Sequence, residues 1–171
     1  MYRILVADDE GIMLEAFKSV ISSTFGDSCI TETAKTGRAV TEKAETFHPD
    51  IVFMDIHMPG INGIQAMREI RKFNTTALFY VVSAYDKFDY AKEAIDLGVE
   101  RYLTKPISKA KIISAWIYTA FFRYRDDHRY SDLHVLQELL DHTDGHCPDT
   151  AQLLCGKIHF LTLFPYVPET E

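Results

Sequence analysis

The stretch Ile4-Leu5-Val6-Ala7-Asp8-Asp9 decides how this chain folds. Four apolar residues in a row predict a short strand, and the continuous apolar run Ile51–Met54 predicts another strand that is buried on both faces, as in parallel sheets. The two acids directly after Ala7 place neighbouring carboxylates at the end of the first strand. Because like charges so close together repel each other, the arrangement is costly unless something positive lies beside them.

Three further apolar runs end in a polar or charged residue in the same way. They are Ile51–Met54 with Asp55, Leu78–Val82 with Ser83, and Arg101–Thr104 with Lys105-Pro106. Parallel strands place their carboxyl ends at one edge of the sheet, and ligands bind in the crevice beyond that edge. We therefore expect acidic, hydroxyl and ammonium groups to meet there.

Helical spacing of apolar residues separates these strands, and a further short strand is expected over residues 29–34. The helix expected near residue 88 carries Phe88, Ala91 and Ile95 on one face, and Leu97-Gly98 ends it with glycine as the left-handed cap. A last helix begins near Ser108 and buries Ile112, Trp116 and Ala120. Alternating strands and helices with short connections predict a doubly wound sheet.

Taken together, these motifs resemble the receiver domain of two-component response regulators. The residues that carry the resemblance are Asp8-Asp9, Asp55-Ile56-His57-Met58-Pro59-Gly60 with Gly63, Ser83-Ala84, and Lys105-Pro106. The resemblance implies an α/β, flavodoxin-like, doubly wound five-stranded parallel sheet with the strand order 2-1-3-4-5. The alternating pattern alone does not fix that order. We expect the receiver domain to span residues 1–121.

The resemblance also implies a role for each strand-end residue. Asp55 would be the phosphoacceptor, and Mg2+ would be bound by Asp9, Asp55 and the backbone carbonyl of His57, with Asp8 acting through water. The ring of His57 would then face solvent. Lys105 would pair with a phosphoryl oxygen, or with Asp55 when no phosphate is bound. Oxygen ligands of this kind suit Mg2+.

Four more residues complete the implied switch. Ser83 would donate its hydroxyl, and Ala84 its backbone N–H, to phosphoryl oxygens. Pro106 would follow a cis peptide bond, which aims Lys105 into the site. Tyr102 is either a half-buried packing residue or a rotating switch aromatic, and its spacing before Lys105 favours the switch. Phosphorylation would shift the population of the face formed by the fourth helix, fifth strand and fifth helix.

The expected function is therefore a signalling switch. The resemblance implies a sensor histidine kinase as partner, and the family often dimerises through the switching face. Such a chain is not an enzyme, although it assists its own phosphoryl transfer and dephosphorylation. With a formal net charge of -7, it is a poor nucleic-acid binder by itself. No apolar stretch reaches membrane-spanning length, no signal peptide is evident, and three cysteines form no disulfide framework, so we expect a cytoplasmic location.

Residues 122–171 are expected to form a short helix-strand appendage, either a linker or part of a connector. The run Ser83–Asp86, with Phe88, Tyr90, Ala91 and Ala94, is similar to receivers usually joined to AraC-type DNA-binding domains. The alternative function is therefore a DNA-binding transcriptional regulator whose output domain is missing from this chain. A zinc site is less favoured than a polar loop, because the spacing does not match for the candidate ligands His142, His146, Cys147, Cys155 and His159.

Two other functions fit these residues less well. A receiver-like protein that binds partners without phosphate would not need the intact set of Asp8, Asp9, Asp55 and Lys105. A flavodoxin-like cofactor enzyme would need a glycine-rich phosphate loop after the first strand, where this chain has acids.

Overall fold

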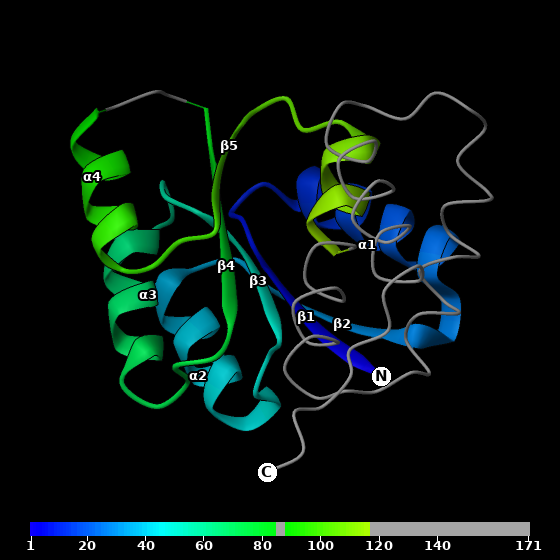
Figure 1. Cartoon of the computed structure of the whole chain (residues 1–171), viewed down its shortest axis with the longest axis horizontal. Coiled ribbons are helices and arrows are strands. Elements are labelled where there is room, and N and C mark those ends of the chain that lie inside the picture. Colours follow the sequence, from blue (N-terminus) through cyan, green and yellow to red (C-terminus); the bar gives the residue numbers. More distant parts are fainter. Residues whose placement is uncertain (85–87, 117–171) are drawn as a thin grey trace, which may run out of the picture. The chain divides into compact units, whose positions relative to one another are not determined.

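The computed structural model describes residues 1–84 and 88–116 (Figure 1). The chain divides between Ile113 and Ser114 into two units, and the first unit contains the whole sheet. The elements are β1 (Tyr2–Ala7), α1 (Gly11–Phe25), a short 3-10 helix (Gly26–Ser28), β2 (Cys29–Ala34), α2 (Gly37–Phe47), β3 (Ile51–Asp55), α3 (Gly63–Arg71), β4 (Leu78–Ser83), α4 (Phe88–Asp96) and β5 (Arg101–Thr104). A further helix begins at Lys109, after Ser108.

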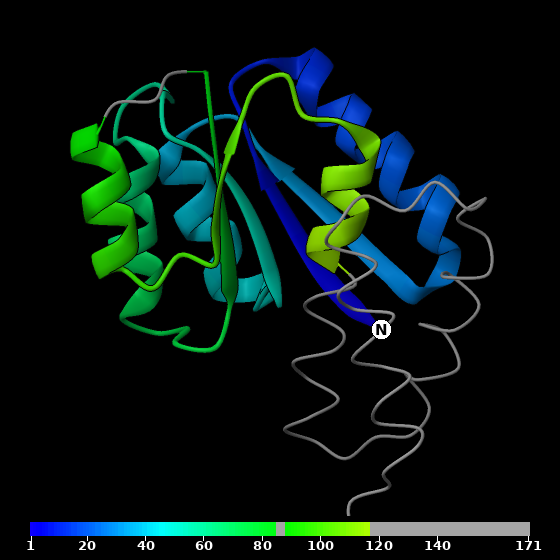
Figure 2. The same cartoon turned by 45° about the horizontal axis from the view of Figure 1, so that its top comes forward.

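All five strands are parallel and their order is β2-β1-β3-β4-β5. The expected fold class and strand order are therefore confirmed. Helices α2, α3 and α4 lie on one face of the sheet and α1 lies on the other (Figure 2). The central strand β3 is buried at every position, as its continuous apolar run predicted.

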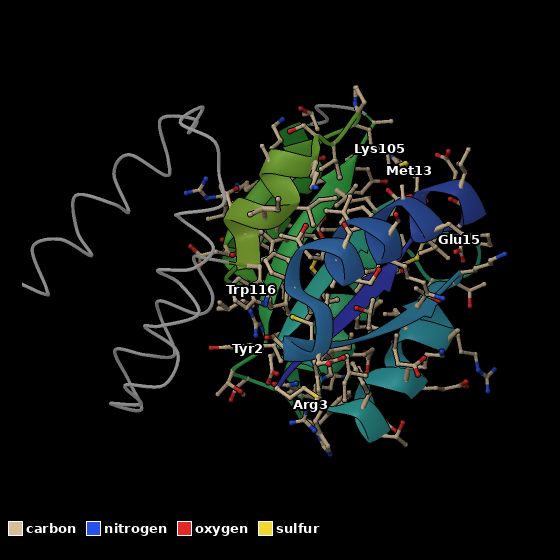
Figure 3. The ribbon with its side chains drawn as sticks, turned by 90° about the vertical axis from the view of Figure 1, so that its right-hand side faces the viewer. Tyr2, Arg3, Met13, Glu15, Lys105 and Trp116 are labelled. Atoms are coloured by element: carbon tan, nitrogen blue, oxygen red, sulfur yellow. The ribbon has the colours of Figure 1, made fainter. Side chains whose placement is uncertain are left out.

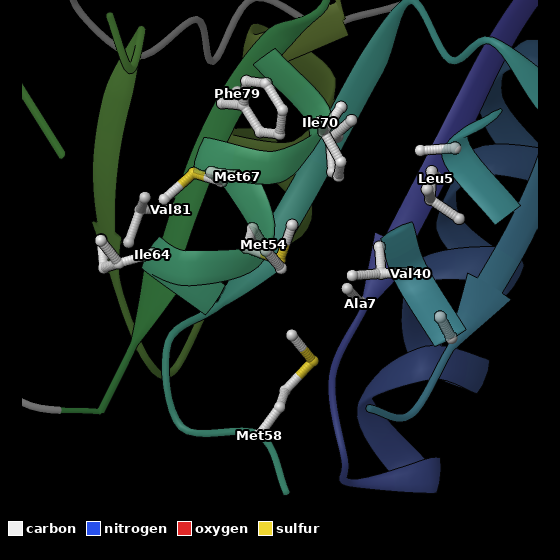
Figure 4. Packing of buried hydrophobic residues seen from close by; sticks show 14 of the residues in the cluster. Leu5, Ala7, Val40, Met54, Met58, Ile64, Met67, Ile70, Phe79 and Val81 are labelled. Atoms are coloured by element: carbon white, nitrogen blue, oxygen red, sulfur yellow. The ribbon is translucent and has the colours of Figure 1, made fainter. Parts of the chain in front are cut away.

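The core on the α2–α4 side of the sheet is built from alternate strand residues and the inner faces of these helices. Leu5, Met54 and Phe79 point from three strands toward this side, where Met67 and Ile70 of α3 pack against them (Figure 4). The strand residues that alternate with these point to the other face of the sheet. There the ring of Phe53 lies between those of Phe17 and Tyr80, tilted against the first with centroids 4.9 Å apart and stacked on the second with centroids 5.3 Å apart.

The burial of α4 differs from the expectation. Ile95 was expected on the inner face, but it is 74% exposed. The buried stripe instead runs through Ala94, with Tyr90 and Leu97 packed against the core. These three residues are spaced four and three apart, which places them on one helical face, and Ile95 lies a further 100° around the helix. The side chains of Phe88 and Ala91 lie outside the described residues.

Several local expectations were correct. Gly98 has φ +67, so it ends α4 in the left-handed conformation. Ile112 and Trp116 are buried. Ala120, the domain boundary after residue 121, the appendage over 122–171 and the candidate zinc ligands all lie outside the described residues. In the described part of the chain, no helix has the length and apolar character needed to cross a membrane.

Candidate functional site at the carboxyl edge of the sheet

The carboxyl ends of four strands bring the predicted residues to one edge of the sheet. Asp8 follows β1, Asp55 ends β3, Ser83 ends β4 and Lys105 follows β5. The view in Figure 3 shows Lys105 at the same end of the molecule as Met13 of α1, and Tyr2 and Arg3 at the opposite end. This arrangement is unavoidable once all strands are parallel, because their carboxyl ends then share one edge.

Asp8 is the most buried acid of the group, with 1% of its surface exposed. Its Oδ1 accepts a hydrogen bond from the backbone N–H of Glu10 at 2.9 Å, and its Oδ2 lies 2.8 Å from the Nζ of Lys105. The backbone N–H of Asp8 donates to the carbonyl of Ala34 at 3.1 Å, which fixes the residue to the end of β2. The carboxylate is therefore held rigidly at the bottom of the site.

Asp9 and Glu10 are exposed, and they continue the acidic run toward solvent. One carboxylate oxygen from each of Asp8, Asp9 and Glu10 lies within 4.8 Å of the others. Three negative charges at this spacing repel each other strongly, and a hard cation would relieve that repulsion.

Asp55 is the last residue of β3 and is buried. Burial raises the pKa of its carboxyl above the ordinary value, the charge of Lys105 lowers it, and the charge of Asp8 raises it again. The pKa of Asp55 is raised overall, which means that the positive charge nearby does not compensate for the cost of ionising the carboxyl group in this buried place. A divalent cation would supply the missing charge.

Lys105 is the ammonium group at the centre of the site. Its Nζ lies 2.8 Å from Asp8 Oδ2, 3.4 Å from Glu10 Oε1 and 3.5 Å from Asp55 Oδ2. Burial lowers the pKa of Lys105, but contacts with Asp8, Asp55 and Glu10 outweigh burial and raise it. The peptide bond to Pro106 is cis, as expected, and the backbone N–H of Lys105 donates to the carbonyl of Ser83 at 2.8 Å.

Ser83 and Ala84 lie where β4 leaves the sheet. Ser83 is fully buried and Ala84 is exposed. Tyr102 lies on β5, where it is half-buried and packs against the core on the α2–α4 side. The hydroxyl, the backbone N–H and the aromatic ring expected of the switch thus stand on or directly after two neighbouring strands, β4 and β5.

The loop between β3 and α3 is folded tightly against Asp55. The N–H of Gly63 donates to the carbonyl of Ile56 at 3.0 Å, and a Cβ at Gly63 would lie only 2.1 Å from the carbonyl oxygen of Asp55. Directly before Gly63, Asn62 forms a reciprocal capping box with Gln65 that starts α3. Only glycine fits at position 63, and its presence fixes the path of the loop beside Asp55.

His57 extends from this loop and is exposed. Its ring contacts the edge of Tyr90 on α4, with the centroids 5.7 Å apart and the planes at 83°. The expectation from the sequence treated only its backbone carbonyl as functional. This contact links His57, two positions after Asp55, to α4. The only feature of the sequence that could have suggested the contact is the aromatic residue Tyr90 near the start of the helix.

Glu10 is a residue of the site that the sequence does not single out. Its place in the sequence puts it in the loop after β1, yet its carboxylate reaches Lys105, 95 residues further along the chain. The acidic run Asp8-Asp9-Glu10 is visible in the sequence, but the partner of Glu10 depends on how β5 is placed.

The donor set of the site is suited to a small divalent cation. The carboxylates of Asp8, Asp9 and Asp55 and the backbone carbonyls of the loop after β3 are hard oxygen ligands, which Mg2+ prefers over nitrogen or sulfur. No thiol belongs to this edge among the described residues, since Cys29 begins β2 at the opposite end. The uncompensated charge on Asp55 fits the same kind of ligand.

Comparison with known proteins points to one family. Residues 4–117 match the family described as the response regulator receiver domain. The chain is 35% identical over 151 residues to the uncharacterized transcriptional regulatory protein YesN of Bacillus subtilis, a match that covers 87% of this chain and 40% of that protein. It is 34% identical over 113 residues to the chemotaxis protein CheY of Thermotoga maritima, covering 66% of this chain and 92% of CheY.

Among solved structures, the chain resembles one in the CheX-CheY-BeF3-Mg complex from Borrelia burgdorferi. The two share 26% sequence identity with a TM-score of 0.62, over 68% of this chain and 87% of that one. The chain thus spans nearly all of a short relative such as CheY, but less than half of the longer YesN.

Proposed function

The chain belongs to the response regulator receiver family, and on that premise we propose that it accepts a phosphoryl group on Asp55 from a sensor histidine kinase. The observation that carries the proposal is the arrangement at the carboxyl edge, where buried Asp8 and Asp55 share the ammonium of Lys105. A structural ion pair needs one acid for each base. This edge has a surplus of acid, which suits the binding of a divalent cation, and such a cation would offset the negative charge of a transferred phosphoryl group.

Mg2+ is the proposed cofactor. Asp9, Asp55 and the backbone carbonyl of His57 would hold it directly, and Asp8 would act through water. When bound, Mg2+ neutralises the charge that develops on the phosphoryl oxygens. The solved complex of the Borrelia burgdorferi relative includes Mg2+, which supports the same choice here.

The chain's own residues perform the transfer. A carboxylate oxygen of Asp55 attacks phosphorus, the bond from phosphorus to the donor nitrogen breaks, and the electron pair of that bond stays with the imidazole of the donor. The ammonium of Lys105 moves from the acids to an oxygen of the arriving phosphoryl group. The tight packing of Gly63 against the backbone of Asp55 would limit the movement of that residue during the attack. Hydrolysis of the acyl phosphate by water returns Asp55 to its free form.

The output of the transfer would be a population shift. The hydroxyl of Ser83 and the N–H of Ala84 donate to the phosphoryl oxygens, which would draw the end of β4 toward Asp55. Tyr102 then turns inward, and the face formed by α4, β5 and the helix that begins at Lys109 changes shape. A second copy of the chain is the partner that we propose for this face. The cytoplasm is the proposed location of the protein.

A second function is favoured by the relation to YesN, a transcriptional regulatory protein of which this chain matches 40%. The chain would then be the receiver of an AraC-type DNA-binding regulator. Residues 1–121 would form the receiver, and residues 122–171 would be the start of a connector to an output domain. The mass of the native product, or the gene sequence downstream, distinguishes this from a free-standing receiver.

The proposed function is tested by incubating the protein with acetyl phosphate and Mg2+ and measuring its intact mass. One phosphoryl group should be added to the native chain, none to Asp55→Asn, and one to the matched control Asp27→Asn, which removes an exposed acid far from the site. Chelation of Mg2+ should abolish the addition. Equal labelling of the native chain and Asp55→Asn would overturn the assignment.

A further inference from the structure

The ammonium of Lys105 is shared by three carboxylates of unequal exposure. The side chains of Asp8 and Asp55 are 2% and 4% exposed, while that of Glu10 is 57% exposed. Lys105 therefore stands between two buried acids and one acid at the mouth of the site. Its shortest contact, at 2.8 Å, is with Asp8 and not with the acid that would be phosphorylated.

This position conflicts with the binding of a divalent cation. An ammonium within 2.8 Å of Asp8 and 3.5 Å of Asp55 occupies part of the space that a cation on Asp55, and the water joining that cation to Asp8, would fill. Two positive charges at such separations repel each other strongly at the low effective dielectric of a buried site. Lys105 and the cation therefore compete for the same oxygens, and the ammonium has to leave them when the cation binds.

The backbone of Lys105 restricts where the ammonium can go. Its N–H is bonded to the carbonyl of Ser83, so the main chain stays in place and only the side chain swings. Glu10 is the one carboxylate of the three that is not among the proposed cation ligands, and it already lies 3.4 Å from the ammonium. Its backbone N–H is held by Asp8, which keeps the residue beside the site.

We propose that Glu10 is a positioning residue that receives the ammonium of Lys105 when a divalent cation is bound, directly by Asp55 and through water by Asp8. This inference rests on the proposed function, and it assigns a role to a residue that the function itself does not use. Glu10 keeps Lys105 close to the site but off the cation ligands, so that the ammonium remains ready for a phosphoryl oxygen. Without Glu10, the ammonium of Lys105 has no other acid to pair with, so it competes more strongly with the cation for the oxygens of Asp8 and Asp55.

The test is a double-mutant cycle on Mg2+ affinity, measured by titration calorimetry on the full chain at fixed ionic strength. Glu10→Gln should weaken Mg2+ binding about fivefold when Lys105 is present. In Lys105→Met, where no ammonium has to move, the same substitution should change affinity by less than about twofold. Glu15→Gln, at an exposed position of α1 paired with Lys18, is the matched control and should change affinity in neither background.

The outcomes separate the two proposals. If Glu10→Gln weakens binding equally with and without Lys105, Glu10 acts on the cation itself and the inference is wrong, although the proposed function stands. If Glu10→Gln has no effect in either background, the inference is wrong in the same way. If the native chain does not bind Mg2+ at all, both the inference and the proposed function fall.

Discussion

The two edges of the sheet use their polar residues in opposite ways. At the amino edge, Asp50, Asn74 and Arg71 direct their polar atoms to backbone groups. At the carboxyl edge, Asp8 and Asp55 share the ammonium of Lys105. Both edges contain buried acids and a basic residue, so composition does not distinguish them. What distinguishes them is that the amino edge pairs its polar groups with the main chain, whereas the carboxyl edge places two buried carboxylates on one ammonium.

The amino edge is closed by hydrogen bonds to the main chain. Asp50 accepts from the N–H of Arg3 at 2.7 Å, and Asn74 donates to the carbonyl of Pro49 at 3.0 Å and accepts from the N–H of Ala77 at 3.0 Å. Arg71 donates to four backbone carbonyls, those of Leu97, Gly98, Thr75 and Ala77. These partners satisfy the polar groups without a ligand, and we infer that the role of this edge is structural.

The largest expected effect is therefore a loss of stability at the amino edge. Arg71 joins the end of α3 to the loops before β4 and β5, and its guanidinium lies 4.5 Å from the ring centroid of Phe79. Arg71→Met leaves its carbonyl acceptors without a donor and should lower the free energy of unfolding by about 3 kcal/mol. Urea denaturation measures this, with Arg38→Met as the exposed control. Because the fold and not the site is affected, Mg2+ affinity should be unchanged, and a loss of affinity without a loss of stability would break the comparison.

Asn74→Ala should have the next largest effect. The substitution leaves the N–H of Ala77 and the carbonyl of Pro49 without partners in a buried place, which costs about 2 kcal/mol. The same denaturation experiment measures it. A change within error would mean that water replaces the amide and that the main chain does not close this edge.

At the carboxyl edge, removing a buried polar group should increase stability instead of lowering it. Asp55→Asn should stabilise the metal-free protein at neutral pH, because it removes a buried charge whose pKa is raised by burial and by Asp8. A raised pKa means that the folded state holds a proton more readily than the unfolded state, so the destabilisation due to Asp55 is present above the folded pKa and disappears as the pH falls toward the unfolded value.

The measurement is the difference in melting temperature between the native chain and Asp55→Asn from pH 7 downward, without metal. The difference should be largest at neutral pH and should shrink in acid. A variant that melts lower than the native chain at pH 7 would show that the ion pair with Lys105 outweighs burial.

The smallest effect is expected at a surface ion pair that belongs to neither edge. Lys43 Nζ lies 2.6 Å from Glu32 Oε2, and both side chains are half-exposed. The hydrogen bond from Lys43 lowers the pKa of Glu32. The contribution of this ion pair to stability is therefore present above the pKa that Glu32 has in the unfolded chain, and it is lost as the pH falls through the pKa in the folded protein. Lys43→Ala should cost at most about 0.5 kcal/mol and less in high salt. A larger, salt-independent loss in urea denaturation would contradict this.

The sequence predicted the carboxyl edge better than the amino edge. Three strands of the site contain a continuous apolar run, and the fourth, β5, is located by the Lys105-Pro106 pair that follows it. Parallel pairing then brings Asp8, Asp55, Ser83 and Lys105 together. The network of Arg71 could not be predicted in the same way, because its acceptors are backbone carbonyls. Any residue type supplies a carbonyl, so no pattern in the sequence points to such a network.

Two further misses have physical causes. The inner face of α4 was placed through Ile95, which is exposed, because a helix of nine residues offers few turns from which to fix its phase. The contact between Glu10 and Lys105 depends on two loops that are 95 residues apart in the chain. Local spacing carries no information about such a pair until the strand order is known.

We propose that, among the described residues, ligand chemistry is confined to the carboxyl edge of the sheet. Backbone amide shifts, measured by NMR before and after addition of Mg2+ and beryllofluoride as a phosphoryl analogue, test it most directly. We predict that the large changes lie at Asp8–Gly11, Asp55–Gly60, Ser83 and Lys105, that Asp50, Arg71 and Asn74 stay nearly unchanged, and that Asp55→Asn abolishes the response to beryllofluoride. Equal changes at both edges, or no change at Asp55, would contradict the account.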